Sequence, residues 1–171
     1  KGPLHAGANI KVQGMFDCVK ANVRDPHNDD ELSDFLLRIL KGKANDGSGL
    51  IYGMGHAVYT KSDPRAVMLK RYARQLAQDK GYGEDFELLE SIERLTPEVF
   101  NTYKGKHHDI CANVDLYSGL VYRMLGIPTE MYTPLFTIAR TAGWCAHRME
   151  EILSSGKIMR PGYKCNVRAR S

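Results

Sequence analysis

One short segment, 29–43, restricts the possible fold more than any other part of the chain. Its apolar residues recur at positions i, i+3 and i+4, the spacing that places side chains on one face of an α-helix. These residues are Leu32, Phe35, Leu36, Ile39 and Leu40. Asp29 or Asp30 can cap this helix, and Gly42 marks its end. No segment alternates apolar and polar residues as a strand does, so the sequence predicts an all-α fold.

Other segments carry similar helix signals. Asp63 followed by Pro64 is a typical helix start, because aspartate caps a helix and proline is best tolerated at the first helical position. Thr96 followed by Pro97 repeats this start and predicts a break between two shorter helices. The predicted helices are 8–23, 29–43, 64–81, 83–95, 96–105, 114–125 and 133–153.

Composition and charge narrow the class of protein. Of the 171 residues, 43% are hydrophobic and 26% are charged, as in an ordinary globular protein. The net charge is +4, and the basic residues are scattered apart from the final "NVRARS". A nucleic-acid-binding protein would show a basic patch, so we expect small anionic ligands instead. No apolar run reaches the roughly 18 residues that span a bilayer, and no membrane association is expected.

The cysteines and the N-terminal residues add two expectations. None of the four cysteines forms a CxxC pair or has zinc-site spacing with histidine, which favours reduced, buried thiols in a reducing compartment and no metal site. The chain opens on "KGPLHAGAN", without an initiator methionine or a targeting segment. We therefore expect a fragment or a processed product.

Two histidines lie in loops that contain glycine, away from any apolar helix face. His56 lies in "GMGHAVYTKSDPRA" and His5 in "GPLHAGAN". Glycine lets a ligand approach the backbone closely, although each histidine could equally bind only loop carbonyl groups. Gly53 and Gly55 do not form a dinucleotide-binding motif, because Val58 stands where a third glycine is required.

Four charged residues have ambiguous positions when each is taken alone. Arg65 lies in a first helical turn, where its charge opposes the helix dipole; it could hold an anion or simply pair with an acid. Asp115 also lies near a helix start, where a dipole contact would explain it. Arg140, inside the last helix, needs an acid or an anionic ligand, whereas Arg160 lies in a polar tail. With the two histidines, this set suits proton abstraction next to a carbonyl group of a carboxylate-bearing substrate.

The same stretches together resemble the citrate synthase family, in its bacterial form. The matching stretches are "GPLHAGAN", "GMGHAVYTKSDPRA", "ICANVDLYSGLVYRMLGIPTEMYTPLFTIARTAGWCAHRME" and "KIMRPGYK". They follow the family's order and cover most of the chain. The resemblance implies that acetyl-CoA and oxaloacetate condense to citryl-CoA, which the same enzyme hydrolyses to citrate and CoA. It implies acetyl-CoA as a substrate, and neither a metal nor a cofactor.

Three residues match the family's catalytic groups. His5 matches the histidine that stabilises the enol of acetyl-CoA, and Asp115 matches the base that removes a proton from the acetyl methyl group. His56 matches the histidine that polarises the oxaloacetate ketone. Neutral histidine donors would stabilise the charge that develops on these oxygens.

The resemblance also implies the binding residues. Arg65 and Arg140 match arginines that bind the oxaloacetate carboxylates, and Arg160 matches an arginine contributed across the dimer interface. The residues implied to contact CoA are Gly53, Met54, Gly55, Lys61 and Asn113.

The family has a large and a small helical domain, with the active site between them. By resemblance, 1–7 is a catalytic loop of the large domain, and 8–126 is the small, CoA-binding domain. The remaining segment, 127–171, would be a helix and tail of the large domain. The chain would then lack the N-terminal half or more of a typical member, be inactive alone, and belong to a cytoplasmic homodimer.

Three alternatives stay open. A 2-methylcitrate synthase performs the same chemistry on propionyl-CoA with the same catalytic groups. A citryl-CoA lyase module of a larger protein would reverse the reaction. A non-catalytic helical interaction domain would have no reason to retain two histidines, Asp115 and three arginines together.

Overall fold

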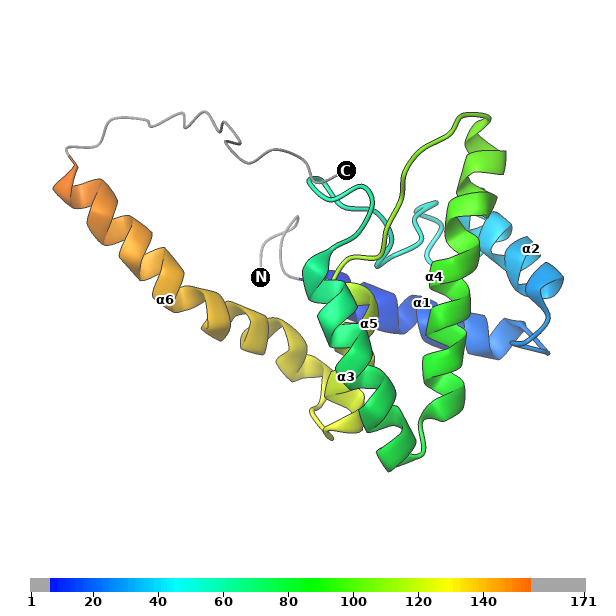
Figure 1. The fold of residues 1–171 in the computed structure, drawn as a ribbon, viewed down its shortest axis with the longest axis horizontal. Helices are drawn as coiled ribbons and strands as arrows, with labels where there is room; N and C mark the ends of the chain where they lie inside the picture. Colours follow the sequence, from blue (N-terminus) through cyan, green and yellow to red (C-terminus); the bar gives the residue numbers. More distant parts are fainter. Residues whose placement is uncertain (1–6, 155–171) are drawn as a thin grey trace, which may run out of the picture. The chain divides into compact units, whose positions relative to one another are not determined.

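The computed structural model describes residues 7–154, and every regular element in that range is a helix (Figure 1). The predicted all-α class is confirmed. The elements are α1 (Ala8–Asn22), α2 (Asp29–Leu40), α3 (Pro64–Lys80), α4 (Gly83–Lys104), α5 (Asp115–Met124), the 3-10 helix η1 (Thr129–Met131) and α6 (Tyr132–Leu153). No helix within this range is long and apolar enough to cross a membrane.

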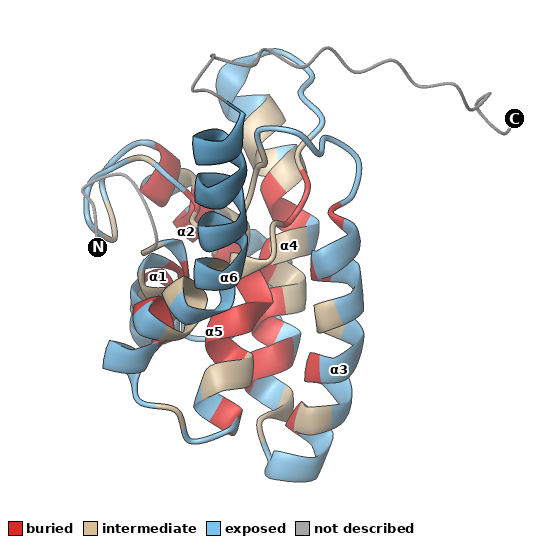
Figure 2. Cartoon of the chain, turned by 90° about the vertical axis from the view of Figure 1, so that its left-hand side faces the viewer, coloured by how far each residue is buried: buried red, intermediate tan, exposed pale blue. Residues whose placement is uncertain are grey.

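The chain forms two compact units, Lys1–Phe136 and Thr137–Ser171. In the first unit α5 lies at the centre, packed against α1, α3 and α4, while α2 packs against α4. Figure 2 shows α5 as the most completely buried helix, in line with full burial of Leu116 and Tyr117. Packing against these three neighbours therefore helps to fix the position of α5.

The predicted N-terminal cap of α3 is confirmed, whereas the predicted cap of α2 is not. Asp63 caps α3 as predicted, accepting a hydrogen bond from the backbone N–H of Arg65 at 3.0 Å. The predicted cap of α2 is wrong: Asn28 caps it, and its Oδ1 accepts from the backbone N–H groups of Asp30 and Glu31 at 3.1 Å each. The aspartates that follow lie in the first turn, where their charge suits the helix dipole.

The predicted break at Thr96-Pro97 is also wrong, because α4 continues through it as one helix. The apolar face is unbroken across the proline, since Ile92 and Leu95 are buried and Val99 packs against the same core. The hydroxyl of Thr96 donates to the carbonyl of Ile92 at 2.6 Å within the helix. Burial of a continuous face thus outweighs the roughly 3 kcal/mol that an interior proline costs.

The last helix crosses the division between the two units. In the first unit Tyr132 is buried, and its hydroxyl donates to the carbonyl of Gly119 at 3.2 Å. In the second unit several large apolar side chains are exposed. These are Ile138, Trp144, Met149, Ile152 and Leu153.

Candidate active site

Two loop segments of the first unit pair with each other and create the site. Segment 53–55 lies antiparallel to 111–113 through a bridge between their middle residues. The backbone N–H of Gly55 donates to the carbonyl of Cys111 at 2.8 Å. The backbone N–H of Asn113 donates to the carbonyl of Gly53 at 2.9 Å. The pairing joins the loop before α3 to the segment before α5.

The side chain of Asn113 strengthens this connection. Its Nδ2 donates to the carbonyl of Gly55 at 3.0 Å, and its Oδ1 accepts from the backbone N–H of Asp115 at 3.0 Å. One amide therefore ties the first residue of α5 to the residue that precedes His56 in the chain.

Gly53 is required where the two segments meet. Its φ is +85°, in the left-handed region that favours glycine. A Cβ at this position would lie 2.9 Å from the Cα of Leu116, at the start of α5. The absence of a side chain therefore allows the loop to approach the helix closely.

His56 follows this pairing, and its hydrogen bonds define its tautomer. Its Nδ1 accepts from the backbone N–H groups of Val58 and Tyr59, both at 3.0 Å. Because a backbone N–H can only donate, Nδ1 carries no proton, and the neutral ring has its proton on Nε2. The half-buried imidazole is thus prepared to donate one hydrogen bond from Nε2.

Arg65 lies beside this donor. Its Nε and Nη2 donate to the two carboxylate oxygens of Asp63 at 3.1 and 2.9 Å, and the bond to Arg65 lowers the pKa of that fully buried aspartate. Nη2 also lies 3.2 Å from Nε2 of His56. The guanidinium is half exposed, so Arg65 is both paired with an acid and open to a ligand.

Asp115 completes the arrangement as the first residue of α5, and it is half-buried. The pKa of Arg65 is raised chiefly by its hydrogen bond to Asp63, and the negative charge of Asp115 adds to this effect. The carboxylate of Asp115 is therefore close enough to Arg65 to act on its charge. Two donors and one base can hold a polar ligand and remove a proton next to it.

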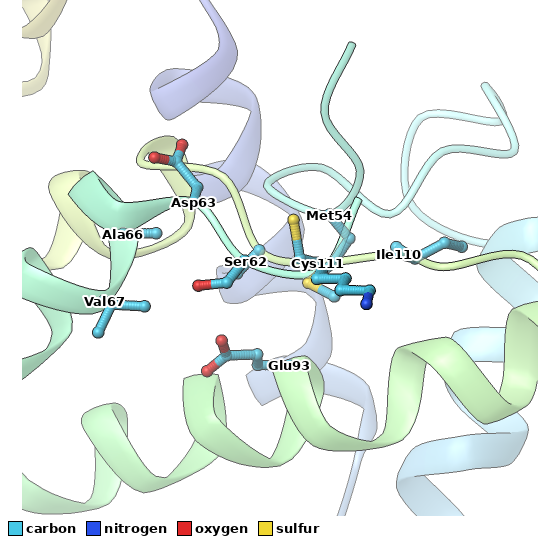
Figure 3. A pocket seen from close by; sticks show the side chains of 10 residues that line it. Met54, Ser62, Asp63, Ala66, Val67, Glu93, Ile110 and Cys111 are labelled. Carbon is cyan, nitrogen blue, oxygen red and sulfur yellow. The ribbon is translucent and has the colours of Figure 1, made fainter. Parts of the chain in front are cut away.

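Two hollows adjoin the site. A cavity of about 160 Å³ lies beneath the loop, and Figure 3 shows Glu93 projecting into it from α4, with Ser62 and Cys111 nearby. Lys61 and Met54, predicted to contact CoA, also line this cavity. A second, apolar hollow of about 350 Å³ is lined by Pro64, Arg65, Met68, Leu69, Tyr72 and Val114.

Three further predicted site residues lie elsewhere in the chain. His5 and Arg160 lie outside the described residues. Arg140 is half-buried on α6, in the second compact unit. Within 7–154, no cluster of three or more histidine, cysteine, aspartate or glutamate side chains could hold a metal ion.

Two residues that support His56 were not predicted from the sequence. The ring of Tyr59 packs against the imidazole with 4.8 Å between centroids, and its carbonyl accepts from the thiol of Cys111 at 3.3 Å. Burial raises the pKa of the Cys111 thiol, which keeps it protonated as a donor. The three-residue spacing from His56 to Tyr59, typical of a tight turn, is the signal that could have identified the tyrosine.

Comparison with known proteins gives consistent matches. Residues 1–162 match the family described as "Citrate synthase, C-terminal domain". A citrate synthase of Synechocystis sp. is 42% identical over 162 residues, which are 94% of this chain and 36% of that protein. A citrate/2-methylcitrate synthase of Bacillus subtilis is 37% identical, over 94% of this chain and 38% of that protein. The chain thus spans well under half the length of these relatives.

A solved structure agrees with the sequence matches. It is the citrate synthase of Thermoplasma acidophilum in a ternary complex with carboxymethyl coenzyme A and oxalateacetate. The TM-score is 0.70 at 31% identity, and the match covers 100% of this chain and 42% of that one.

Proposed function

The chain belongs to the citrate synthase family, and from that membership we propose that it is the C-terminal part of an enzyme that makes citrate. The enzyme condenses acetyl-CoA with oxaloacetate and hydrolyses the resulting citryl-CoA. One observation carries the proposal: the donors Nε2 of His56 and Nη2 of Arg65 lie 3.2 Å apart, near the charge of Asp115.

Oxaloacetate has a ketone and two carboxylates, and all of them accept hydrogen bonds. We assign the ketone oxygen to Nε2–H of His56 and one carboxylate to Arg65, whose guanidinium is oriented by Asp63. The ternary complex of the Thermoplasma relative, which contains oxalateacetate, supports this class of ligand. Arg140 would bind a carboxylate in the same subunit, and Arg160 would reach the site of the other subunit.

The reaction follows from these assignments. Asp115 takes a proton from the acetyl methyl group, and His5 donates a hydrogen bond to the thioester carbonyl as enolate charge develops there. The methyl carbon then forms a bond to the ketone carbon. The former ketone oxygen, beside His56, gains a proton and becomes a hydroxyl. Water finally cleaves the thioester, which releases CoA and citrate.

We propose the domain assignment made by resemblance, with 1–7 and 127–171 in the large domain and 8–126 as the small domain. The remainder of the large domain would cover the exposed apolar side chains of α6. In this assignment the isolated chain has an incomplete site and forms no citrate. The complete protein would act as a homodimer in the cytoplasm.

The residues proposed to contact CoA differ in which of their groups are available for binding. Backbone groups of Gly53, Gly55 and Asn113 are engaged in the pairing of the two loop segments. Met54 and Lys61 line the cavity of about 160 Å³, and their side chains are therefore the stronger candidates for contact with CoA.

The second candidate function is 2-methylcitrate synthesis, which is favoured by the name of the Bacillus relative. The complete subunit that contains this sequence should be assayed with oxaloacetate and either acetyl-CoA or propionyl-CoA. The proposal predicts a higher kcat/KM with acetyl-CoA, and a higher value with propionyl-CoA would assign the second function. Turnover of neither substrate would contradict both functions and would favour an interaction domain.

The isolated 171-residue chain is the matched control for this assay. It should release no CoA from either thioester in the presence of oxaloacetate. Citrate formation by this chain alone would contradict the proposed need for the rest of the large domain.

A further inference from the structure

Glu93 joins the two helices that carry the site. Its carboxylate, on α4, accepts a hydrogen bond from the hydroxyl of Tyr117 on α5 and another from Nζ of Lys70 on α3 at 2.6 Å. Arg65 lies in the first turn of α3, and Asp115 is the first residue of α5. The side chain of Glu93 thus connects α3, which carries the proposed oxaloacetate-binding Arg65, to α5, which carries the proposed base Asp115.

Burial and charge keep both hydrogen-bond donors to Glu93 protonated. Tyr117 is fully buried, and burial together with the bond to Glu93 raises the pKa of its phenol, so the hydroxyl remains a donor at neutral pH. Burial alone would lower the pKa of Lys70, but its bonds to Glu93 and Glu90 outweigh this effect and raise it. Both donors to Glu93 therefore keep their protons under physiological conditions.

A neighbouring ion pair on the same helix serves for comparison. Arg94 follows Glu93 directly, and its two terminal nitrogens donate to the carboxylate of Asp29 on α2 at 2.7 Å each. Both partners of that pair are about half exposed, and neither α2 nor Asp29 belongs to the site. Glu93, in contrast, lines the cavity together with Asp63, the residue that orients Arg65 (Figure 3).

We propose that Glu93 and Tyr117 are positioning residues that fix the first turn of α5 relative to α3, and so fix Asp115 relative to Arg65. The inference rests on the proposed function for its catalytic consequence. His56 is held by backbone N–H groups of its own loop, and Arg65 is held by Asp63, so neither depends on the bond between Glu93 and Tyr117. Loss of the contact therefore misplaces the base while oxaloacetate binding is retained.

The test uses Tyr117→Phe and Glu93→Gln in the complete subunit. Tyr117→Phe removes the donor and keeps the buried ring, and Glu93→Gln keeps the shape and removes the charge. Misplacement of a reacting group by about 1 Å can cost about a hundredfold in rate, so we expect kcat to fall about ten- to a hundredfold. The KM for oxaloacetate should stay within about twofold, because uniform binding of that substrate is unchanged.

Arg94→Gln is the matched control, because it breaks an interhelical ion pair one residue away without touching α3 or α5. It should lower stability slightly and leave kcat unchanged. A kcat loss of equal size in Arg94→Gln, or a wild-type kcat in folded Tyr117→Phe, would overturn the inference.

Amide hydrogen exchange of the 171-residue chain separates this inference from the proposed function. Tyr117→Phe should accelerate exchange in the first turn of α5 relative to wild type, and Arg94→Gln should not. An inactive wild-type subunit would contradict the proposed function alone. Unchanged exchange in α5 would contradict the positioning role, whatever the activity.

Discussion

Nη2 of Arg65 and Nε2 of His56 face each other across 3.2 Å, and both are hydrogen-bond donors. Two donors at this distance form no hydrogen bond with each other. Both groups can donate to oxygen acceptors, and a keto acid supplies a carbonyl and a carboxylate together.

This relationship predicts that Arg65→Lys weakens oxaloacetate binding. Lysine cannot hold the two oxygens of Asp63 and a ligand carboxylate with one planar group. Hydrogen bonds to charged groups contribute about 1.5–3 kcal/mol, so KM for oxaloacetate should rise about ten- to a hundredfold in the complete subunit. Steady-state kinetics at saturating acetyl-CoA measures this rise.

Arg71→Lys provides the control, because Arg71 is an exposed arginine of the same helix outside the site. Its KM should equal the wild-type value. The same KM in Arg65→Lys and Arg71→Lys would contradict the assignment of Arg65.

Gly53→Ala should destabilise the chain much more than Gly55→Ala. Both glycines have φ near +85° to +89°, which costs an L-residue about 1–3 kcal/mol. Only at Gly53 does an added Cβ also meet the backbone of Leu116 at 2.9 Å, whereas at Gly55 no atom lies within 4 Å. Urea unfolding of the 171-residue chain should show the difference, and equal losses for the two variants would contradict the close approach of loop and helix.

The stability of the chain should fall in acid through Asp46. Its pKa lies well below the ordinary value of 3.8, because Ser48, then Lys11 and Tyr52, donate hydrogen bonds to its carboxylate. A pKa that is lower in the folded state stabilises the fold above the unfolded-state value and loses this effect as pH falls below it. The difference in unfolding free energy between wild type and Asp46→Asn should therefore be constant above about pH 5 and shrink below about pH 4.

Urea unfolding at pH 7 and at pH 3 measures this difference. Asp34→Asn, at an exposed position of α2, is the control and should change little at either pH. A loss in Asp46→Asn that is as large at pH 3 as at pH 7 would show that the carboxylate charge is not its cause.

Features governed by a few neighbouring residues could be predicted from the sequence. The cap of α3 by Asp63 and the apolar face of α2 depend on contacts within about one helical turn. The resemblance to the family grouped His56, Arg65 and Asp115. In the structure His56 and Arg65 are in contact, and the charge of Asp115 is close enough to raise the pKa of Arg65.

Features decided by tertiary contacts could not be predicted. The continuation of α4 through Pro97 depends on burial against other helices, which outweighs a local helix-breaking signal. The bond from Asn113 to Gly55 joins residues 58 positions apart, and no local pattern indicates such a partner. The hydrogen bond between Glu93 and Tyr117 could not be predicted either, because it joins two different helices and no local pattern marks either residue.

The most direct test of the central claim is citrate formation by the complete subunit carrying Asp115→Asn. This change keeps the size of the side chain and removes the base. General base catalysis contributes about a hundred- to ten-thousandfold, so kcat should fall by that factor. Oxaloacetate binding, measured by calorimetry, should survive because His56 and Arg65 are retained. A wild-type kcat in Asp115→Asn would contradict the account.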